Sequence, residues 1–173
     1  MNHMMIDLET FGVQHNCVVL SAGIVVFRDC APFDASNILH KEYHKLSVSA
    51  QVEEGRVIEA GTLRWWLDPT RIGKIPLDGE ILLGNLLRLI SGVWEEFGCK
   101  RVWSHGATFD LMILQNAAGK RPLPWKYHDM RDTRTLYEVF KVTLPKNSHD
   151  ALEDAVNQTV AVLKCWDILD CTY

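Results

Sequence analysis

The chain has 173 residues, of which 47% are hydrophobic and 23% are charged. This composition is typical of a globular protein and excludes a disordered or fibrous chain. The formal net charge of −4 argues against broad, nonspecific binding of polyanions, although it leaves room for a local basic patch or for bound cations. A chain of this length can bury roughly two-thirds of its unfolded surface, so it needs no disulfide or structural metal to fold. We expect residues 1–173 to form a single domain.

The cysteines and the N-terminus indicate the compartment. The five cysteines are odd in number and include no Cys-x-x-Cys pair, so neither a disulfide framework nor a zinc knuckle is indicated. Carboxylates occur too early in the chain for the apolar segment of a signal peptide. No apolar run approaches the about 20 residues that span a bilayer. We therefore expect a cytoplasmic protein that has no membrane partner.

The first part of the chain is predicted to form strands. Residues 4–8 are a short apolar run, residues 17–28 are rich in β-branched side chains, and residues 40–48 alternate weakly between apolar and polar. This succession predicts an antiparallel start to a sheet.

Helices and strands alternate in the rest of the chain. Apolar spacing and capping residues predict helices at 60–67, 79–97, 108–118, 132–140 and 148–170, the last capped by Asn147 or Ser148. Strands are predicted at 101–104 and 127–130, and loops at 71–78 and 119–130. The order predicts an α/β layer fold, with a mixed sheet of about five strands flanked by helices.

Two carboxylates interrupt the first apolar strand. The strand period of two places Asp7 and Glu9 on one face, roughly 7 Å apart, with Ile6 and Leu8 on the other face. Two like charges on a core strand repel each other and are costly to desolvate, and a divalent cation would reverse that penalty. The alternative is that Glu9 lies at the exposed end of the strand and that Asp7 is hydrogen-bonded. Taken alone, the pair leaves both interpretations open.

Two later segments carry further carboxylates. Asp110 lies in the first turn of a predicted helix, where the helix dipole favours a carboxylate in any protein. His149 and Asp154 are five residues apart at the start of the last predicted helix. On a helical wheel Asp154 falls about 200° from Leu152, away from the apolar stripe, which taken alone indicates a solvent-exposed residue. That stripe contains Leu152, Val156, Val160, Leu163 and Trp166.

As an ordered set, these segments resemble the DEDD-type 3′–5′ exonucleases of the His subgroup, the DnaQ-like enzymes. The resemblance covers residues 4–160 and implies a ribonuclease H-like fold. It implies that Asp7 and Glu9 carry the first motif, Asp110 the second, and His149 with Asp154 the third. The Asp-Ala pair at 154–155 fits the family, and so selects Asp154 over the nearby acidic residues.

One position departs from the family pattern. Many members have His-Asn-Ala-x-Phe-Asp in the second motif, whereas this chain has Gly106 in place of the asparagine. The departure puts in doubt one hydrogen bond that would support a metal ligand. It does not put any metal ligand itself in doubt. The Trp65-Trp66 pair and residues 131–136 resemble small bacterial and phage exonucleases of the superfamily. The two tryptophans cannot both face one way on a helix, so we expect one in the core and the other in the substrate groove or in a homodimer interface.

The resemblance implies phosphodiester hydrolysis assisted by two divalent cations, Mg²⁺ or else Mn²⁺. Asp7, Glu9, Asp110 and Asp154 would hold the cations, and Asp7 would bridge the two. His149 would be the general base that takes the proton from the attacking water, a role that suits an unperturbed histidine pKa of about 6.5.

The expected partner is the 3′ end of a single-stranded nucleic acid. Thr10 and Phe11 follow the catalytic strand and are candidates to wedge the terminal base. His105 and Phe109 are further candidates, although Phe109 is also a candidate core residue. DNA and RNA remain open, because that distinction depends on contacts to the 2′-hydroxyl from loops that the sequence does not place.

A basic segment could hold the nucleic-acid backbone. Residues 119–146 carry seven basic and three acidic side chains, a net charge of +4, and Arg131 and Arg134 belong to this set. The alternative is an ordinary solvated loop and helix. For the whole chain, the alternative to an exonuclease is a non-catalytic nucleic-acid-binding module on the same scaffold. The presence of all four carboxylates and of the histidine favours the enzyme.

Overall fold

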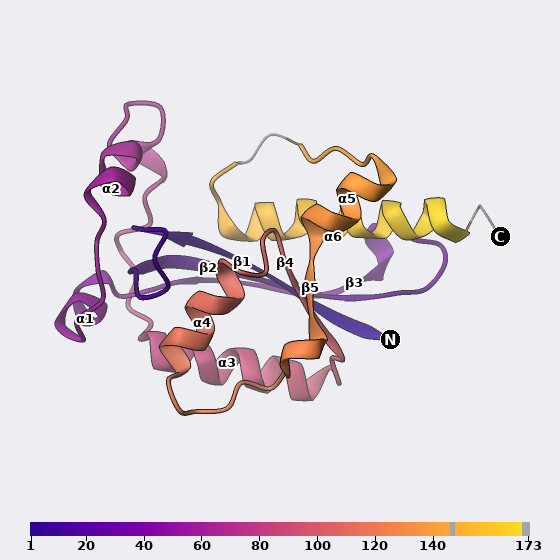
Figure 1. Ribbon diagram of the computed structural model, residues 1–173, viewed down its shortest axis with the longest axis horizontal. Coiled ribbons are helices and arrows are strands. Elements are labelled where there is room, and N and C mark those ends of the chain that lie inside the picture. Colours follow the sequence, from indigo (N-terminus) through magenta and orange to yellow (C-terminus); the bar gives the residue numbers. More distant parts are fainter. Residues whose placement is uncertain (146–147, 171–173) are drawn as a thin grey trace.

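The structure is a computed structural model that describes residues 1–145 and 148–170. Asn147, one of the two expected helix caps, and Lys146, part of the basic segment, lie outside the described residues. The fold is built on a five-stranded sheet with the strand order β3-β2-β1-β4-β5 (Figure 1). The sheet is mixed, because β1, β2 and β3 pair antiparallel whereas β1, β4 and β5 pair parallel. The predicted mixed sheet of about five strands is therefore confirmed.

The strands are β1 (Asn2–Thr10), β2 (Val19–Arg28), β3 (Ile38–Lys45), β4 (Arg101–Ser104) and β5 (Met130–Asp132). The last one differs most from its prediction. Tyr127–Asp129 forms a 3-10 turn, and the strand begins only at Met130, where the chain can pair with β4. The strand predicted at 127–130 is therefore found later in the chain, at Met130–Asp132, where it pairs with β4.

The helices include one that the sequence did not predict. They are α1 (Val48–Glu53), α2 (Ala60–Trp66), α3 (Leu83–Glu96), α4 (Asp110–Ala118), α5 (Thr133–Phe140) and α6 (Ala151–Asp170). The sequence predicts a strand that ends at residue 48, but Ser47 caps α1 by accepting a hydrogen bond from the Ala50 N–H. This capping bond gives the backbone a local alternative to the strand.

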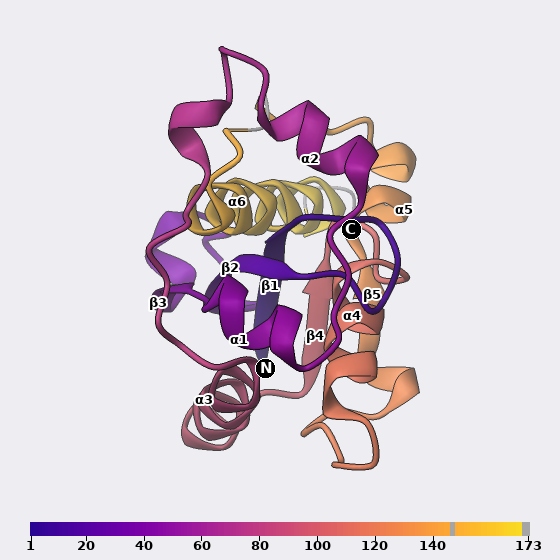
Figure 2. The same ribbon diagram turned by 90° about the vertical axis from the view of Figure 1, so that its left-hand side faces the viewer.

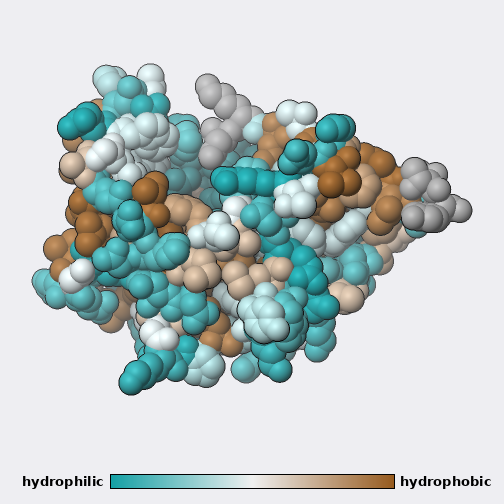
Figure 3. All heavy atoms as spheres, in the orientation of Figure 1, coloured by the Kyte–Doolittle hydropathy of each residue, from teal (hydrophilic) through white to brown (hydrophobic). Residues whose placement is uncertain are grey.

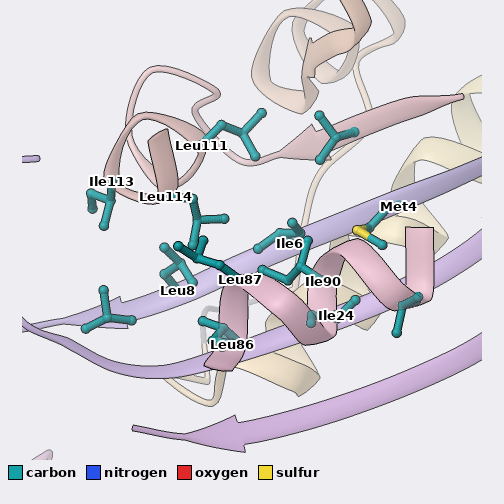
Figure 4. Close-up of a cluster of buried hydrophobic side chains, with 14 of the residues drawn as sticks. Met4, Ile6, Leu8, Ile24, Leu86, Leu87, Ile90, Leu111, Ile113 and Leu114 are labelled. Atoms are coloured by element: carbon teal, nitrogen blue, oxygen red, sulfur yellow. The ribbon is translucent and has the colours of Figure 1, made fainter. Parts of the chain in front are cut away.

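The helices cover both faces of the sheet. α3 and α4 lie on one face, and α5 and α6 lie on the other (Figures 1 and 2). Along β1 the residues alternate as predicted. Met4, Ile6 and Leu8 pack into the core beneath α3 and α4 (Figure 4), whereas Met5 packs with the side chains of α6. By the same alternation Asp7 and Glu9 are on the α6 face.

The seating of α6 corrects one interpretation of the sequence. The fully buried face of this helix carries mostly small and polar side chains, and the predicted apolar stripe is only half-buried except for Leu163. Asp154, which the helical wheel taken alone placed in solvent, is 5% exposed. The reason is a close approach to the sheet: a Cβ atom at Gly23 of β2 would lie 2.1 Å from the backbone oxygen of Ala151. Large side chains do not fit where the helix lies this close.

Exposed apolar side chains lie at the end of the molecule that α5 and α6 form. In Figure 3 hydrophobic residues gather where α5 and the last turns of α6 lie, and Val139, Ile168 and Leu169 are exposed. Within residues 1–145 and 148–170, no helix has both the length and the apolar character needed to cross a membrane.

Candidate active site

Three of the predicted carboxylates converge. Asp7 and Glu9 come from the end of β1, and Asp154 comes from the first turn of α6. A ligand oxygen from each lies within 4.8 Å of the others. Glu9 and Asp154 are buried, and Asp7 is half-buried. Strand alternation and the close seating of α6 thus bring together residues that lie far apart in the sequence.

Asp110 approaches the same place from the other side of β1. β4 ends at Ser104, so it does not continue beside the last residues of β1. Asp110, the first residue of α4, accepts a hydrogen bond from the Leu8 N–H at 3.1 Å, and its side chain is buried. It is not part of the three-carboxylate cluster, but it lines the same cavity as Asp7 and Glu9.

That cavity has a volume of about 310 Å³. Four of the six predicted substrate-binding residues line it, namely Thr10, His105, Phe109 and Arg134. Phe11 does not, since it is buried in a small apolar cluster with Val18, Leu20 and Trp66. Arg131 also does not, because it borders a separate groove beside β5 and α5.

Burial and mutual repulsion shift the acidity of the site. Burial, reinforced by the charges of Asp7 and Asp154, raises the pKa of Glu9 to about 9. Burial also raises the pKa of Asp7 well above its ordinary value, with the nearby Asp110 as the next cause. Burial raises the pKa of Asp110 as well, against the lowering effect of the Leu8 N–H. The raised pKa values mean that simultaneous ionisation of these carboxylates is unfavourable. A bound cation would lower the free energy of the ionised carboxylates.

Asp154 also shapes the loop that carries His149. Its carboxylate accepts hydrogen bonds from the backbone N–H groups of Ser148 and His149, each at 3.0 Å. The expectation that His149 opens the helix is wrong. The helix begins at Ala151, and His149 lies before it with a left-handed backbone, φ +59°. The side chain lines the cavity that Asp7 and Glu9 line.

The two tryptophans of α2 contact this histidine. The His149 ring lies edge-on to Trp65, with centroids 4.8 Å apart, and 6.1 Å from Trp66. Trp66 is buried and donates its indole N–H to the Thr10 carbonyl at 2.9 Å. Trp65 is 39% exposed, lines the cavity and carries the Arg71 guanidinium over its ring. One tryptophan is thus core and the other faces the groove, as the sequence predicted.

Gly106, the residue that departs from the family pattern, has an unusual backbone conformation and lies beside Arg134. Its φ of +110° is a conformation that residues with a side chain rarely adopt. A Cβ atom there would lie 3.2 Å from the Arg134 guanidinium carbon. Arg134 therefore occupies space beside Gly106, and it is the one basic residue of 119–145 that lines the cavity.

Two residues of the site were missed. Gln158 donates its side-chain N–H to Asp7 at 2.6 Å, and Lys74 donates to the Ser148 carbonyl at 2.7 Å. The signal for Gln158 was available, because residues four apart share a helix face and Gln158 follows Asp154 by four. Lys74 carried no such signal, since it reaches the site from a loop distant in the sequence.

Comparisons with solved structures show the same fold. The zinc-bound form of E. coli exonuclease I with single-stranded DNA matches with a TM-score of 0.64 and 14% identity, over 98% of this chain and 43% of that one. The same enzyme with a dT13 oligonucleotide matches with a TM-score of 0.63 and 13% identity, over 94% and 40%. This chain thus spans less than half of the length of these structures. At such identities the likeness establishes the fold, which is ribonuclease H-like.

The sequence comparison establishes the family. No curated protein sequence matches the chain. Residues 2–166, however, match the family described as the 3′-5′ exoribonuclease Rv2179c-like domain. This match spans every motif residue placed above. The chain therefore belongs to the family of Rv2179c-like 3′-5′ exoribonuclease domains.

Proposed function

We propose that residues 1–173 form one exonuclease domain that removes nucleotides singly from the 3′ end of single-stranded nucleic acid. The domain would use two divalent cations, Mg²⁺ or Mn²⁺, and release nucleoside 5′-monophosphates. The observation that supports this most strongly is the meeting of Asp7, Glu9 and Asp154, together with the cavity that Asp7, Glu9 and His149 line. The family assignment supports this enzyme over a non-catalytic binding module on the same scaffold.

The residues present fit hard cations. Carboxylate oxygens are the ligands that Mg²⁺ and Mn²⁺ prefer, and the three clustered side chains each offer one. In this proposal Asp7, Glu9 and Asp154 hold one cation, and Asp7 with Asp110 supports the second. Bound cations activate a water molecule and stabilise the charge on the leaving 3′ oxygen.

Other side chains would bind substrate and move the proton. His149 is proposed to accept the proton of the attacking water, with its ring held against Trp65 and Trp66. Trp65 is an exposed aromatic residue at the cavity and is proposed to stack on a base near the 3′ end. Arg134 is the proposed phosphate contact, because it is a basic residue at the wall of the cavity that Asp7 and Glu9 also line. Thr10, His105 and Phe109 complete the proposed walls.

RNA is the first substrate to test. The matching family is described as exoribonucleases, whereas the matching solved structures contain DNA oligonucleotides. The experiment compares matched RNA and DNA strands labelled at the 5′ end, as single strands and as duplexes with a 3′ overhang. Mg²⁺, Mn²⁺, Zn²⁺ and EDTA form the metal arms.

The expected result is a ladder that shortens from the 3′ end with Mg²⁺ or Mn²⁺ and no reaction with EDTA. Asp7→Asn should be inactive with every cation, because it weakens the proposed bridge between the cations. Cleavage of a circular single strand, or full activity in EDTA, would refute the proposal.

Two further parts of the proposal concern the cell and the assembly. We propose a cytoplasmic location and a homodimer that uses the apolar end formed by α5 and α6. Light scattering of the purified protein tests the dimer, and Val139→Asp should convert it to a monomer. A wild-type protein that is monomeric at all concentrations would refute it.

A further inference from the structure

Gln158 is a buried polar side chain between two cavities. It is 4% exposed, on the face of α6 that meets the sheet. It lines the cavity of the carboxylate cluster and also a neighbouring cavity of about 230 Å³, which Asp154 lines too. Burying an amide at this depth costs free energy unless hydrogen bonds compensate, so its contacts call for a physical account.

The two ends of the Gln158 amide have different surroundings. The Nε2 group donates to Asp7 Oδ1 at 2.6 Å, while Oε1 accepts no hydrogen bond from the described residues. A hydrogen bond from α5 holds the backbone of this residue, because the Tyr137 hydroxyl donates to the Gln158 carbonyl at 2.7 Å. The side chain is thus fixed with its donor on the Asp7 carboxylate, while its Oε1 is buried away from solvent.

A second buried glutamine shows what a purely structural amide looks like in this fold. Gln51 is 1% exposed, and it both accepts from and donates to the backbone of Val19, at 2.9 and 2.7 Å. It also donates to the Ser47 carbonyl at 3.0 Å. Both ends of its amide are therefore hydrogen-bonded to the backbone, whereas the amide N–H of Gln158 donates to the Asp7 carboxylate in the site.

We propose that Gln158 is a positioning residue for the cation site: its amide N–H, which donates to Asp7 Oδ1 at 2.6 Å, fixes the carboxylate in the orientation that a bound cation needs. This inference rests on the proposed cation site. The donor orients one Asp7 oxygen and favours the ionised carboxylate that a cation needs.

The test replaces each buried glutamine with methionine, which has a similar shape and no donor. The first measurement is Mn²⁺ affinity by electron paramagnetic resonance, without substrate. Gln158→Met should weaken Mn²⁺ binding about 10- to 100-fold, the usual effect of losing a partner that orients a ligand. Gln51→Met is the matched control, and it should lower the melting temperature without changing Mn²⁺ affinity in the folded protein.

The second measurement is the rate at rising Mn²⁺ concentration. Excess Mn²⁺ should restore most of the rate of Gln158→Met, because the defect is in cation binding. Gln158→Ala, which cannot clash with its neighbours, should behave in the same way and covers the case in which the methionine variant does not fold. Unchanged Mn²⁺ affinity in either folded variant would overturn the inference. Absence of Mn²⁺ binding in the wild-type protein would instead refute the proposed cation site itself.

Discussion

At Gly23, the addition of a single methyl group should greatly reduce the activity while the protein still folds. It pairs with Asp7 in the sheet, and the first residue of α6 lies directly above it. In Gly23→Ala the new Cβ would lie 2.1 Å from the Ala151 oxygen and 2.6 Å from the Leu152 Cα. The shortest ordinary contact is 3.4 Å, so the start of α6 must retreat by about 1.3 Å.

That retreat acts on the cluster through Asp154, which lies one helical turn beyond Ala151. A displacement of about 1 Å in a reacting geometry can cost about 100-fold in rate. We expect kcat to fall by about that factor and stability to fall by about 1–3 kcal/mol, the usual cost of overpacking. The assay is single-turnover cleavage of a 5′-labelled strand, with thermal unfolding measured in parallel.

The matched control is Gly92→Ala. Gly92 is exposed within α3, with no atom near the position of a new Cβ. Alanine there should stabilise the helix by about 0.5–1 kcal/mol and leave kcat unchanged. If Gly23→Ala keeps both the wild-type rate and the wild-type Mn²⁺ affinity, the reasoning from the seating of α6 is refuted.

Three other predictions concern the chemistry of the site. His149→Asn, chosen because asparagine tolerates a left-handed backbone, should lower kcat by about 10²–10⁴ and remove the acid limb of the pH–rate profile. An unchanged kcat would exclude His149 as the base. Trp65→Ala should weaken binding of a single strand in Ca²⁺ by about 1–3 kcal/mol, whereas Leu67→Ala, at a neighbouring exposed position, should not; equal effects would contradict stacking. Without cations, stability should fall as the pH rises from about 5 to about 9, because Glu9 titrates near 9 in the folded protein and at an ordinary 4.5 when unfolded. Mg²⁺ should reverse this loss in thermal unfolding, and a flat profile would refute the proton linkage.

The sequence predicted those parts of the site that depend on local periodicity. Alternation along β1 placed Asp7 and Glu9 on one face opposite Ile6 and Leu8, as found. Spacing alone left the choice among the acidic residues near 150–154 open, and the resemblance of the three ordered motifs to a known family implied Asp110 and Asp154. Period and order are properties of the chain itself, which is why they can be read without the fold.

The parts that were missed depend on contacts between distant segments. A helical wheel measures apolarity, but the helix face that meets the sheet was decided by the space at Gly23, where small residues and Asp154 fit. The left-handed turn at His149 depends on the Asp154 carboxylate that receives its N–H. Phe11 is apolar enough for the wedge that was predicted, yet its position beside Trp66 placed it in the core.

The assembly of the cluster from β1 and α6 also has a consequence for how the protein becomes active. During translation the sheet and five of the six described helices emerge before the ribosome has made Asp154. A nascent or truncated chain that ends before Ser148 has Asp7, Glu9 and Asp110, but it lacks His149 and also Asp154, the third member of the carboxylate cluster. Two separately expressed fragments, divided between α5 and Ser148, should therefore each be inert and should regain nuclease activity only by complementation.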